Sequence, residues 1–163
     1  MLITYEELHL RLTNYLSYLR DRDIFLYNYN LILYNTGLRA RELHTMNRWA
    51  VNPDKTFTCT TSKGSNPRIF TCDDLTAYFI NAIQNYLNAW EYNSYDTMNL
   101  YFNRNSACGS IKHLNKYLSL SLYRHHFCKK LHYEGYSDEY IQAKLGEKDL
   151  RNSNNYIYSE LYE

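Results

Sequence analysis

The stretch NTGLRARELHTM, residues 35–46, places two arginines and a glutamate directly after a Thr-Gly break. Glycine is scarce in this chain, with 5 in 163 residues. A glycine that follows an apolar segment is typical of a helix end, because it adopts the left-handed conformation at little cost. The stretch therefore predicts one helix that ends at Gly37 and a short one that restarts in RARELHTM. Taken alone, it is also explained by a helix start with one buried leucine and solvated charges.

The residues before this break predict two helices. Thr4 and Glu7 form a capping pattern, and leucines then recur at helical spacing, so a helix is expected from about Tyr5 to Leu19. After the charged turn RDRD comes IFLYNYNLILYN, which is apolar on most faces. It predicts a buried second helix that leads into Gly37.

The residues after the break predict a β-hairpin. KTFTCTTS alternates apolar residues with threonines, KGSNP is a dense turn signal, and RIFT returns as a second strand. Lys63 and Arg68 would flank the hairpin tip. This gives a mainly helical α+β fold with a small antiparallel sheet.

The remaining chain predicts further helices and one irregular segment. The helices are expected at 72–90, 110–118, 121–134, 137–145 and from about 153. Residues 91–109 have no clear period and are expected to be irregular. The length and the 45% apolar composition fit a single domain, 1–163.

Composition excludes several function classes. No apolar run approaches the roughly 20 residues of a membrane span, and the first residues carry acids where a signal peptide would be basic. We therefore expect a protein without membrane contact that is not exported. The cysteines are far apart and form no CxxC pair, so neither a metal site nor a redox motif is expected: Cys59, Cys72, Cys108 and Cys128.

Charge is uneven along the chain. The net charge is +1, but residues 39–151 contain 15 Lys and Arg against 11 Asp and Glu. This distribution indicates one anion-facing surface, and a solvated mixed surface explains it nearly as well. Tyrosine is abundant, with 19 residues, so most tyrosines must fill the core or the surface.

Three motifs resemble those of one family. TGLRAREL resembles the first active-site motif of the tyrosine recombinases, the phage-integrase family, whose arginine binds the scissile phosphate of DNA; here it is Arg39. TSKGSNPRIF is similar to the family's catalytic-lysine hairpin and places Lys63 24 residues later. The segment 122–159 resembles the C-terminal signature, which makes Arg124 the second arginine and Tyr156, 32 residues on, the nucleophile. The motifs occur in family order over roughly residues 2–162.

The resemblance implies a helical recombinase catalytic domain that needs no cofactor. Tyr156 would attack the phosphate and form a 3′-phosphotyrosyl link, while the arginines stabilise the transition state. Lys63 would protonate the departing 5′ oxygen, and Glu42 would brace the site. The partner would be double-stranded DNA, with a tetramer on DNA possible for a longer form. The location would be the cytoplasm with the nucleoid, or the nucleus of a eukaryote. Further DNA contacts are expected from the basic and imidazole side chains of Arg41, Arg68, Lys112, Lys116 and His125.

Two positions depart from the family pattern. Ser121 stands where the family usually has histidine, and its hydroxyl can still donate to a phosphate oxygen. Glu147 stands where the family has His or Trp, and its carboxylate should repel the transition state. It would be harmless if protonated by burial, paired with Lys144 or Lys148, or turned outward, and the sequence does not choose among these.

The sequence leaves the nucleophile and the function class open. Tyr158 is the runner-up nucleophile, and His125 and His126 are possible substitutes for the missing imidazoles. The N-terminal domain of family recombinases is expected to be absent, so the chain is a fragment or a reduced relative. Its function would be integration, excision or resolution; a cleavage-silent DNA-binding or regulatory relative; or a nicking and closing enzyme like type IB topoisomerases or telomere resolvases.

Overall fold

The computed structural model describes residues 1–44, 50–54, 56–59, 66–71, 97–98, 100, 102 and 119–162. The N-terminal part contains α1 (Tyr5–Arg20), α2 (Ile24–Thr36) and α3 (Ala40–Leu43). The Thr4 hydroxyl accepts a hydrogen bond from the backbone N–H of Glu7 at 3.2 Å, which caps α1 as predicted. The first two predicted helices are confirmed to within one residue at the end of α1 and at the end of α2.

The sheet has three short antiparallel strands in the order β1 (Ala50–Val51), β2 (Phe57–Cys59) and β3 (Arg68–Phe70). Phe57 pairs with Phe70 and Cys59 with Arg68, so the predicted hairpin strands are confirmed. Strand β1 was not predicted, because two residues are too short to give a period-2 pattern. The hairpin tip lies outside the described residues.

Three helices form the C-terminal part: α6 (Leu122–Tyr133), α7 (Asp138–Leu145) and α8 (Leu150–Tyr158). Ser137 caps α7 and the left-handed Gly146 ends it, as the sequence predicted. Helix α8 starts three residues before the predicted Ser153, because Asp149 is its N-cap and accepts from Arg151 N at 2.9 Å.

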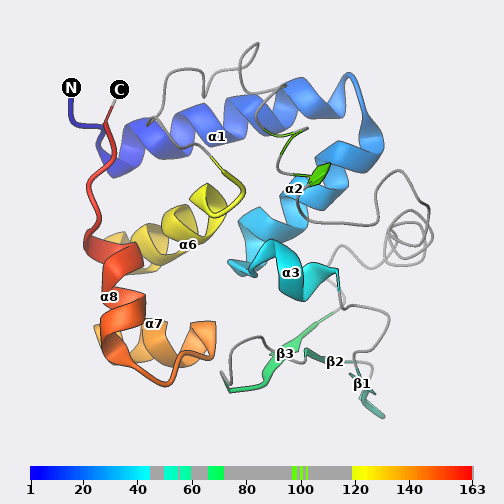
Figure 1. Ribbon diagram of the computed structural model, residues 1–163, viewed down its shortest axis with the longest axis vertical. Helices are drawn as coiled ribbons and strands as arrows, with labels where there is room; N and C mark the ends of the chain where they lie inside the picture. Colours follow the sequence, from blue (N-terminus) through cyan, green and yellow to red (C-terminus); the bar gives the residue numbers. More distant parts are fainter. Residues whose placement is uncertain are drawn as a thin grey trace.

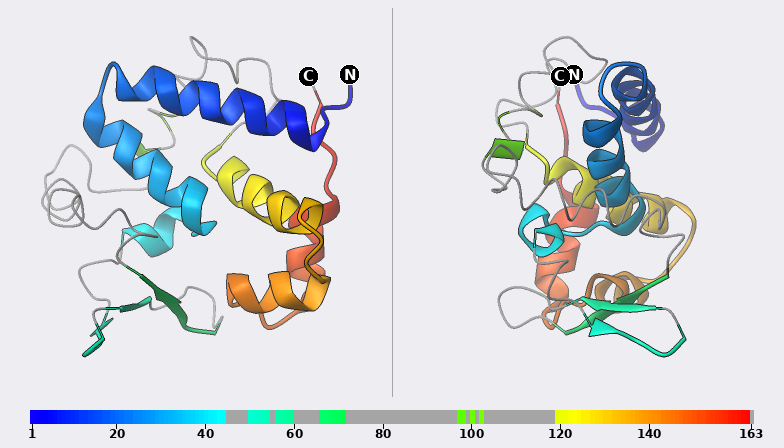
Figure 2. Two further views of the ribbon diagram at one scale, coloured as in Figure 1. Left: turned by 180° about the vertical axis from the view of Figure 1, so that it is seen from behind. Right: turned by 90° about the vertical axis from the view of Figure 1, so that its right-hand side faces the viewer.

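Helix α6 is central to the arrangement (Figure 1). It packs against α1, α2, α7 and α8, and the sheet lies beyond α3. The two chain ends lie side by side (Figure 2), where Leu2 pairs with Tyr162. One buried cluster joins α1, α2 and α6 with the sheet, and a second joins α6, α7 and α8.

One prediction about the middle of the chain needs correction. Residues 91–109 were expected to be irregular, but Thr97, Met98, Leu100 and Phe102 are helical. Met98 and Phe102 are buried in the first core cluster, and the Phe102 ring packs edge-on against Tyr15. Burial in this core explains a helix that the local pattern does not signal. The helices predicted at 72–90 and 110–118 lie outside the described residues.

Candidate active site

Gly37 sets the geometry at the end of α2. Its φ is 65°, and a Cβ there would lie 2.6 Å from Cδ1 of Phe127 on α6. Only glycine fits both the left-handed conformation and this close approach. The glycine therefore lets the chain turn tightly against α6 and leads directly into Arg39.

Arg39 is the N-cap of α3. Its backbone N–H donates to Oε1 of Glu42 at 2.9 Å, and Glu42 is buried. Arg39 Nη1 lies 3.6 Å from the same carboxylate oxygen. Glu42 therefore fixes both the backbone and the guanidinium of Arg39, which agrees with the bracing role expected of it.

Arg124 enters the same region from α6. It is 1% exposed, and its Nη1 donates to the Gly37 carbonyl at 2.7 Å. Its Nη2 donates to Oε1 of Glu147, also at 2.7 Å. The Gly37 carbonyl thus binds the Arg124 side chain at the turn that leads into Arg39, which brings the two arginines together.

Glu147 lies between the two arginines. Its Oε1 accepts hydrogen bonds from Nη2 of Arg39 and Nη2 of Arg124, and its side chain is 3% exposed. Two of the three arrangements considered from the sequence, pairing with a lysine and an outward orientation, do not describe this site. The carboxylate is neither turned outward nor paired with a lysine, but bridges the two candidate phosphate-binding groups.

The backbone before Glu147 is held tightly. Gly146 has a φ of 72°, and a Cβ on it would lie 2.5 Å from the Asn66 carbonyl oxygen. Its own carbonyl accepts from Asn66 N at 2.7 Å. This contact joins the end of α7 to the segment that leads into β3.

Arg68 differs from its expected role at the DNA surface. It is 5% exposed, and its guanidinium donates to the Thr36 carbonyl. Burial, together with the nearby charge of Arg124, lowers its pKa to about 10. Arg68 is therefore a buried cation near Arg124.

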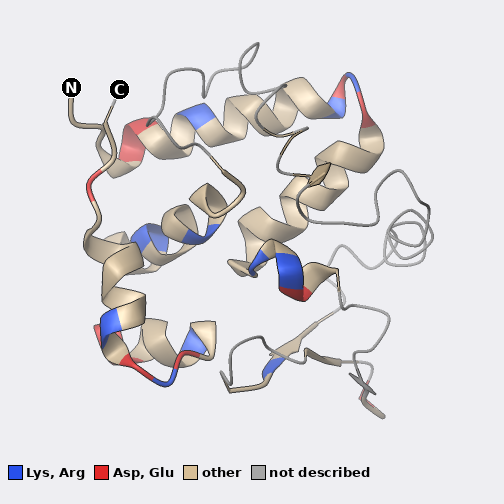
Figure 3. Ribbon diagram, viewed as in Figure 1, with Lys and Arg blue, Asp and Glu red and all other residues tan. Residues whose placement is uncertain are grey.

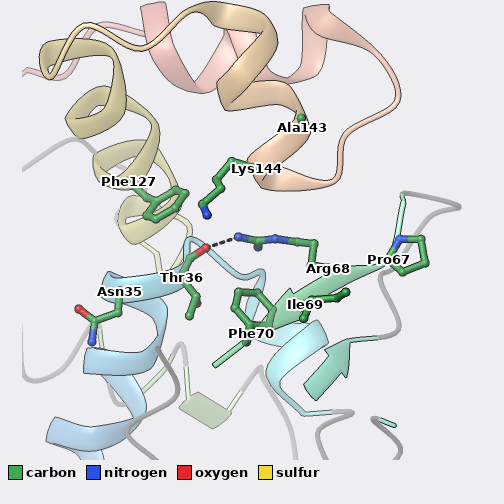
Figure 4. A pocket seen from close by; sticks show the side chains of 9 residues that line it. All are labelled: Asn35, Thr36, Pro67, Arg68, Ile69, Phe70, Phe127, Ala143 and Lys144. Carbon is green, nitrogen blue, oxygen red and sulfur yellow. Dashed lines mark hydrogen bonds between the residues drawn. The ribbon is translucent and has the colours of Figure 1, made fainter. Parts of the chain in front are cut away.

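A cavity of about 310 Å³ adjoins Arg68 (Figure 4). The Lys144 side chain extends from α7 toward Phe127 and Thr36 on its wall. In Figure 3, basic residues lie on α3, α6, α7 and β3, together with acidic residues on α3 and around the turn between α7 and α8.

The two candidate tyrosines on α8 have different surroundings. The Tyr156 ring is half-buried and lies 5.0 Å from Cζ of Arg124. Tyr158 is 54% exposed, and its hydroxyl donates to the Asp138 carboxylate at 2.8 Å, which raises the pKa of the phenol. The position of Tyr156 beside Arg124 favours it as the nucleophile.

Two further candidates, His125 and Ser121, lie on α6 and at its start. His125 is half-buried, stacks edge-on against Tyr156 and pairs with the Ser159 hydroxyl at 2.8 Å. Burial is the main cause that lowers its pKa to about 4, so its ring is neutral at pH 7. Ser121 is exposed at the start of α6 and bonds to the Ser119 hydroxyl.

The remaining predicted site residues are not all within the described part of the chain. Lys63, Lys112 and Lys116 lie outside the described residues, and Arg41 is exposed on α3. Within the described ranges, no cluster of His, Cys, Asp or Glu fits a metal ion. Across those same residues, none of the helices has the length and apolar character of a membrane span.

Neither a protein-family model nor a curated protein matches this sequence. Solved structures do match. The crystal structure of XerA recombinase has a TM-score of 0.68 at 16% identity, over 98% of this chain and 59% of that one. The chain has a recombinase fold. A second neighbour is the XerH site-specific recombinase bound to palindromic difH substrate in a post-cleavage complex, with a TM-score of 0.59 at 14% identity.

The match to XerH covers 94% of this chain and 48% of that one. The chain therefore spans only about half to three fifths of these recombinases. The likeness confirms the predicted mainly helical fold with a small antiparallel sheet.

Proposed function

We propose that this chain binds duplex DNA and breaks and rejoins its strands through Tyr156, as a site-specific recombinase. The convergence of two guanidinium groups on one oxygen atom supports this most strongly. Nη2 of Arg39 and Nη2 of Arg124 both donate to Oε1 of Glu147. An oxygen of a DNA phosphate at this point would receive the same two bonds.

The reaction follows from the residues around that point. The Tyr156 hydroxyl releases its proton to solvent and its oxygen attacks phosphorus. A phosphotyrosyl bond forms, and the bond from phosphorus to the 5′ oxygen breaks. The leaving oxygen takes a proton, for which Lys63 remains the predicted donor. Attack by another 5′-hydroxyl then reverses the step and exchanges strands. No cofactor enters this scheme.

The proposal extends to partners and location. Duplex DNA is the partner, with Arg41 exposed for backbone contact and His125 behind Tyr156. A longer form would act as a tetramer on DNA, in the cytoplasm with the nucleoid. This chain alone would serve as a single catalytic domain.

Covalent capture tests the proposal. The protein is mixed with nicked random duplexes and quenched with detergent, and protein-linked DNA 3′ ends are sought on a denaturing gel. Tyr156→Phe should abolish the adduct, while Tyr158→Phe, a matched change two residues away, should retain it. Joining of the captured strand to a second duplex separates a recombinase from a nicking and closing enzyme. An adduct that survives Tyr156→Phe would refute the assignment.

The position of Glu147 favours a second candidate, a DNA-binding relative that does not cleave. A fixed carboxylate about 4 Å from a phosphate costs on the order of 4 kcal/mol at an effective dielectric of about 20. That corresponds to roughly three powers of ten in rate. Salt-sensitive band shifts without any adduct in the wild type, together with an adduct that appears in Glu147→His, would support this candidate.

A further inference from the structure

We propose that Glu147 is a built-in competitor for DNA phosphate, which closes the arginine pair until a phosphodiester displaces its carboxylate. This inference rests on the proposed function and specifies how the same site is regulated. Oε1 of Glu147 already takes the two Nη2 bonds that a phosphate oxygen needs. The carboxylate and the phosphate therefore cannot occupy the pair together.

The charges favour an exchange of one anion for another. Two arginines, Arg39 and Arg124, meet two carboxylates, Glu42 and Glu147. A phosphodiester carries one negative charge, as a carboxylate does. Its entry in place of the Glu147 carboxylate would thus leave the buried charge unchanged, whereas entry beside that carboxylate would set two like charges next to each other.

The two glutamates differ in how they are held. Glu42 is tied into α3 through the Arg39 backbone N–H at 2.9 Å. Glu147 lies after the end of α7, and among the described residues its carboxylate bonds to the two arginines alone. Its backbone N–H donates to the Gln142 carbonyl at 3.1 Å, so in the proposed exchange the backbone stays in place and the side chain changes rotamer. Glu147 is therefore the exchangeable anion and Glu42 the fixed one.

Thermal unfolding with inorganic phosphate as the probe tests the exchange without DNA or cleavage. Wild type, Glu147→Gln and Glu134→Gln are compared in about 50 mM phosphate and in sodium chloride of equal ionic strength. Glu134 is exposed, so its variant is a matched loss of one charge. Phosphate should raise the melting temperature of Glu147→Gln by roughly 5 °C more than that of the other two proteins.

Further variants keep the test decisive. Adding Arg39→Ala to Glu147→Gln should remove the extra stabilisation, which shows that phosphate binds at the pair. If Glu147→Gln fails to fold in either buffer, Glu147→Asp replaces it, because aspartate keeps the charge but withdraws the carboxylate. Equal phosphate shifts in wild type and the position-147 variant would overturn the inference. Because Tyr156 takes no part, absence of a DNA adduct would bear only on the proposed function.

Discussion

Two faces of α6 bury ionisable side chains in different ways. Arg124 faces the turn at Gly37 and is 1% exposed, while His126 faces α1 and α2 and is fully buried. On the first face, charge is retained and neutralised by Glu42 and Glu147. On the second, burial lowers the pKa of His126 to about 3, so the ring stays neutral.

The neutral face is held together by ring contacts. His126 Nε2 pairs with His9 Nδ1 at 3.1 Å, and its ring stacks on Tyr34 with centroids 4.8 Å apart. Arginine does not become neutral in the same way, and Arg124 is buried in contact with two carboxylates. The first face therefore buries arginine and carboxylate side chains together, whereas the second buries neutral rings that pack on one another.

Among the substitutions on these two faces, Arg124→Ala should have the largest effect on stability. It would leave the buried Glu42 and Glu147 with Arg39 alone of the two arginines they share, and we expect a loss of about 3–5 kcal/mol in the free energy of unfolding. Urea titration measures it. The exposed Arg151→Ala is the control and should change stability little. Equal effects of the two variants would contradict a charge-balanced face.

Gly37→Ala should have the second largest effect on stability, because it strains the turn whose carbonyl binds Arg124. The left-handed backbone costs roughly 1–2 kcal/mol and the overlap with Phe127 a further 1–3 kcal/mol or so. Gly135 is the matched control, because its φ is 93° and no atom lies within 4 Å of a built Cβ. Gly135→Ala should show the backbone cost alone, so equal losses would exclude the clash with Phe127.

His126→Phe should alter the pH dependence of stability. The pKa of His126 in the folded protein, about 3, lies below the ordinary 6.5. The contribution of the neutral ring to stability is therefore fully present above pH 6.5 and is lost as the pH falls toward 3. Phenylalanine cannot be protonated. The loss in the free energy of unfolding between about pH 7 and about pH 5 should therefore be smaller by roughly 2 kcal/mol in the variant. Urea titrations at both pH values measure this. An unchanged slope in His126→Phe would contradict the burial of a neutral ring.

Ser159→Ala should have the smallest effect. It removes the hydroxyl that pairs with His125 Nδ1 at 2.8 Å, and we expect a loss of about 1 kcal/mol. The DNA adduct should weaken as well, because His125 stacks against Tyr156. A loss of adduct without any loss of stability would assign His125 a larger role than positioning.

Much of the fold could be predicted because its signals are local. Thr4, Ser137, Gly37 and Gly146 lie at helix ends, and the helix caps depend on nearby residues alone. The start of α8 was placed too late because Asp149 reads as one acid among several charges. The helical Met98 and Phe102 depend on burial by distant elements, which no local period reveals.

The candidate site was only partly predictable for the same reason. Motif order predicted Arg39, Arg124 and Tyr156, and the fold brings these three together. The bridge from Glu147 to both arginines spans 108 and 23 residues of sequence, so it depends on the fold. The burial of Arg68 against Thr36 likewise depends on how β3 packs against the end of α2.

Mapping the DNA-linked residue tests the central claim most directly. After capture on nicked duplexes and nuclease treatment, trypsin should release a peptide that begins at Asn152 and contains Tyr156, Tyr158 and Tyr162. Fragmentation by mass spectrometry then locates the attached nucleotide. The account predicts the nucleotide on Tyr156. Attachment to Tyr158 or Tyr162, or no attachment in both wild type and Glu147→Gln, would contradict it.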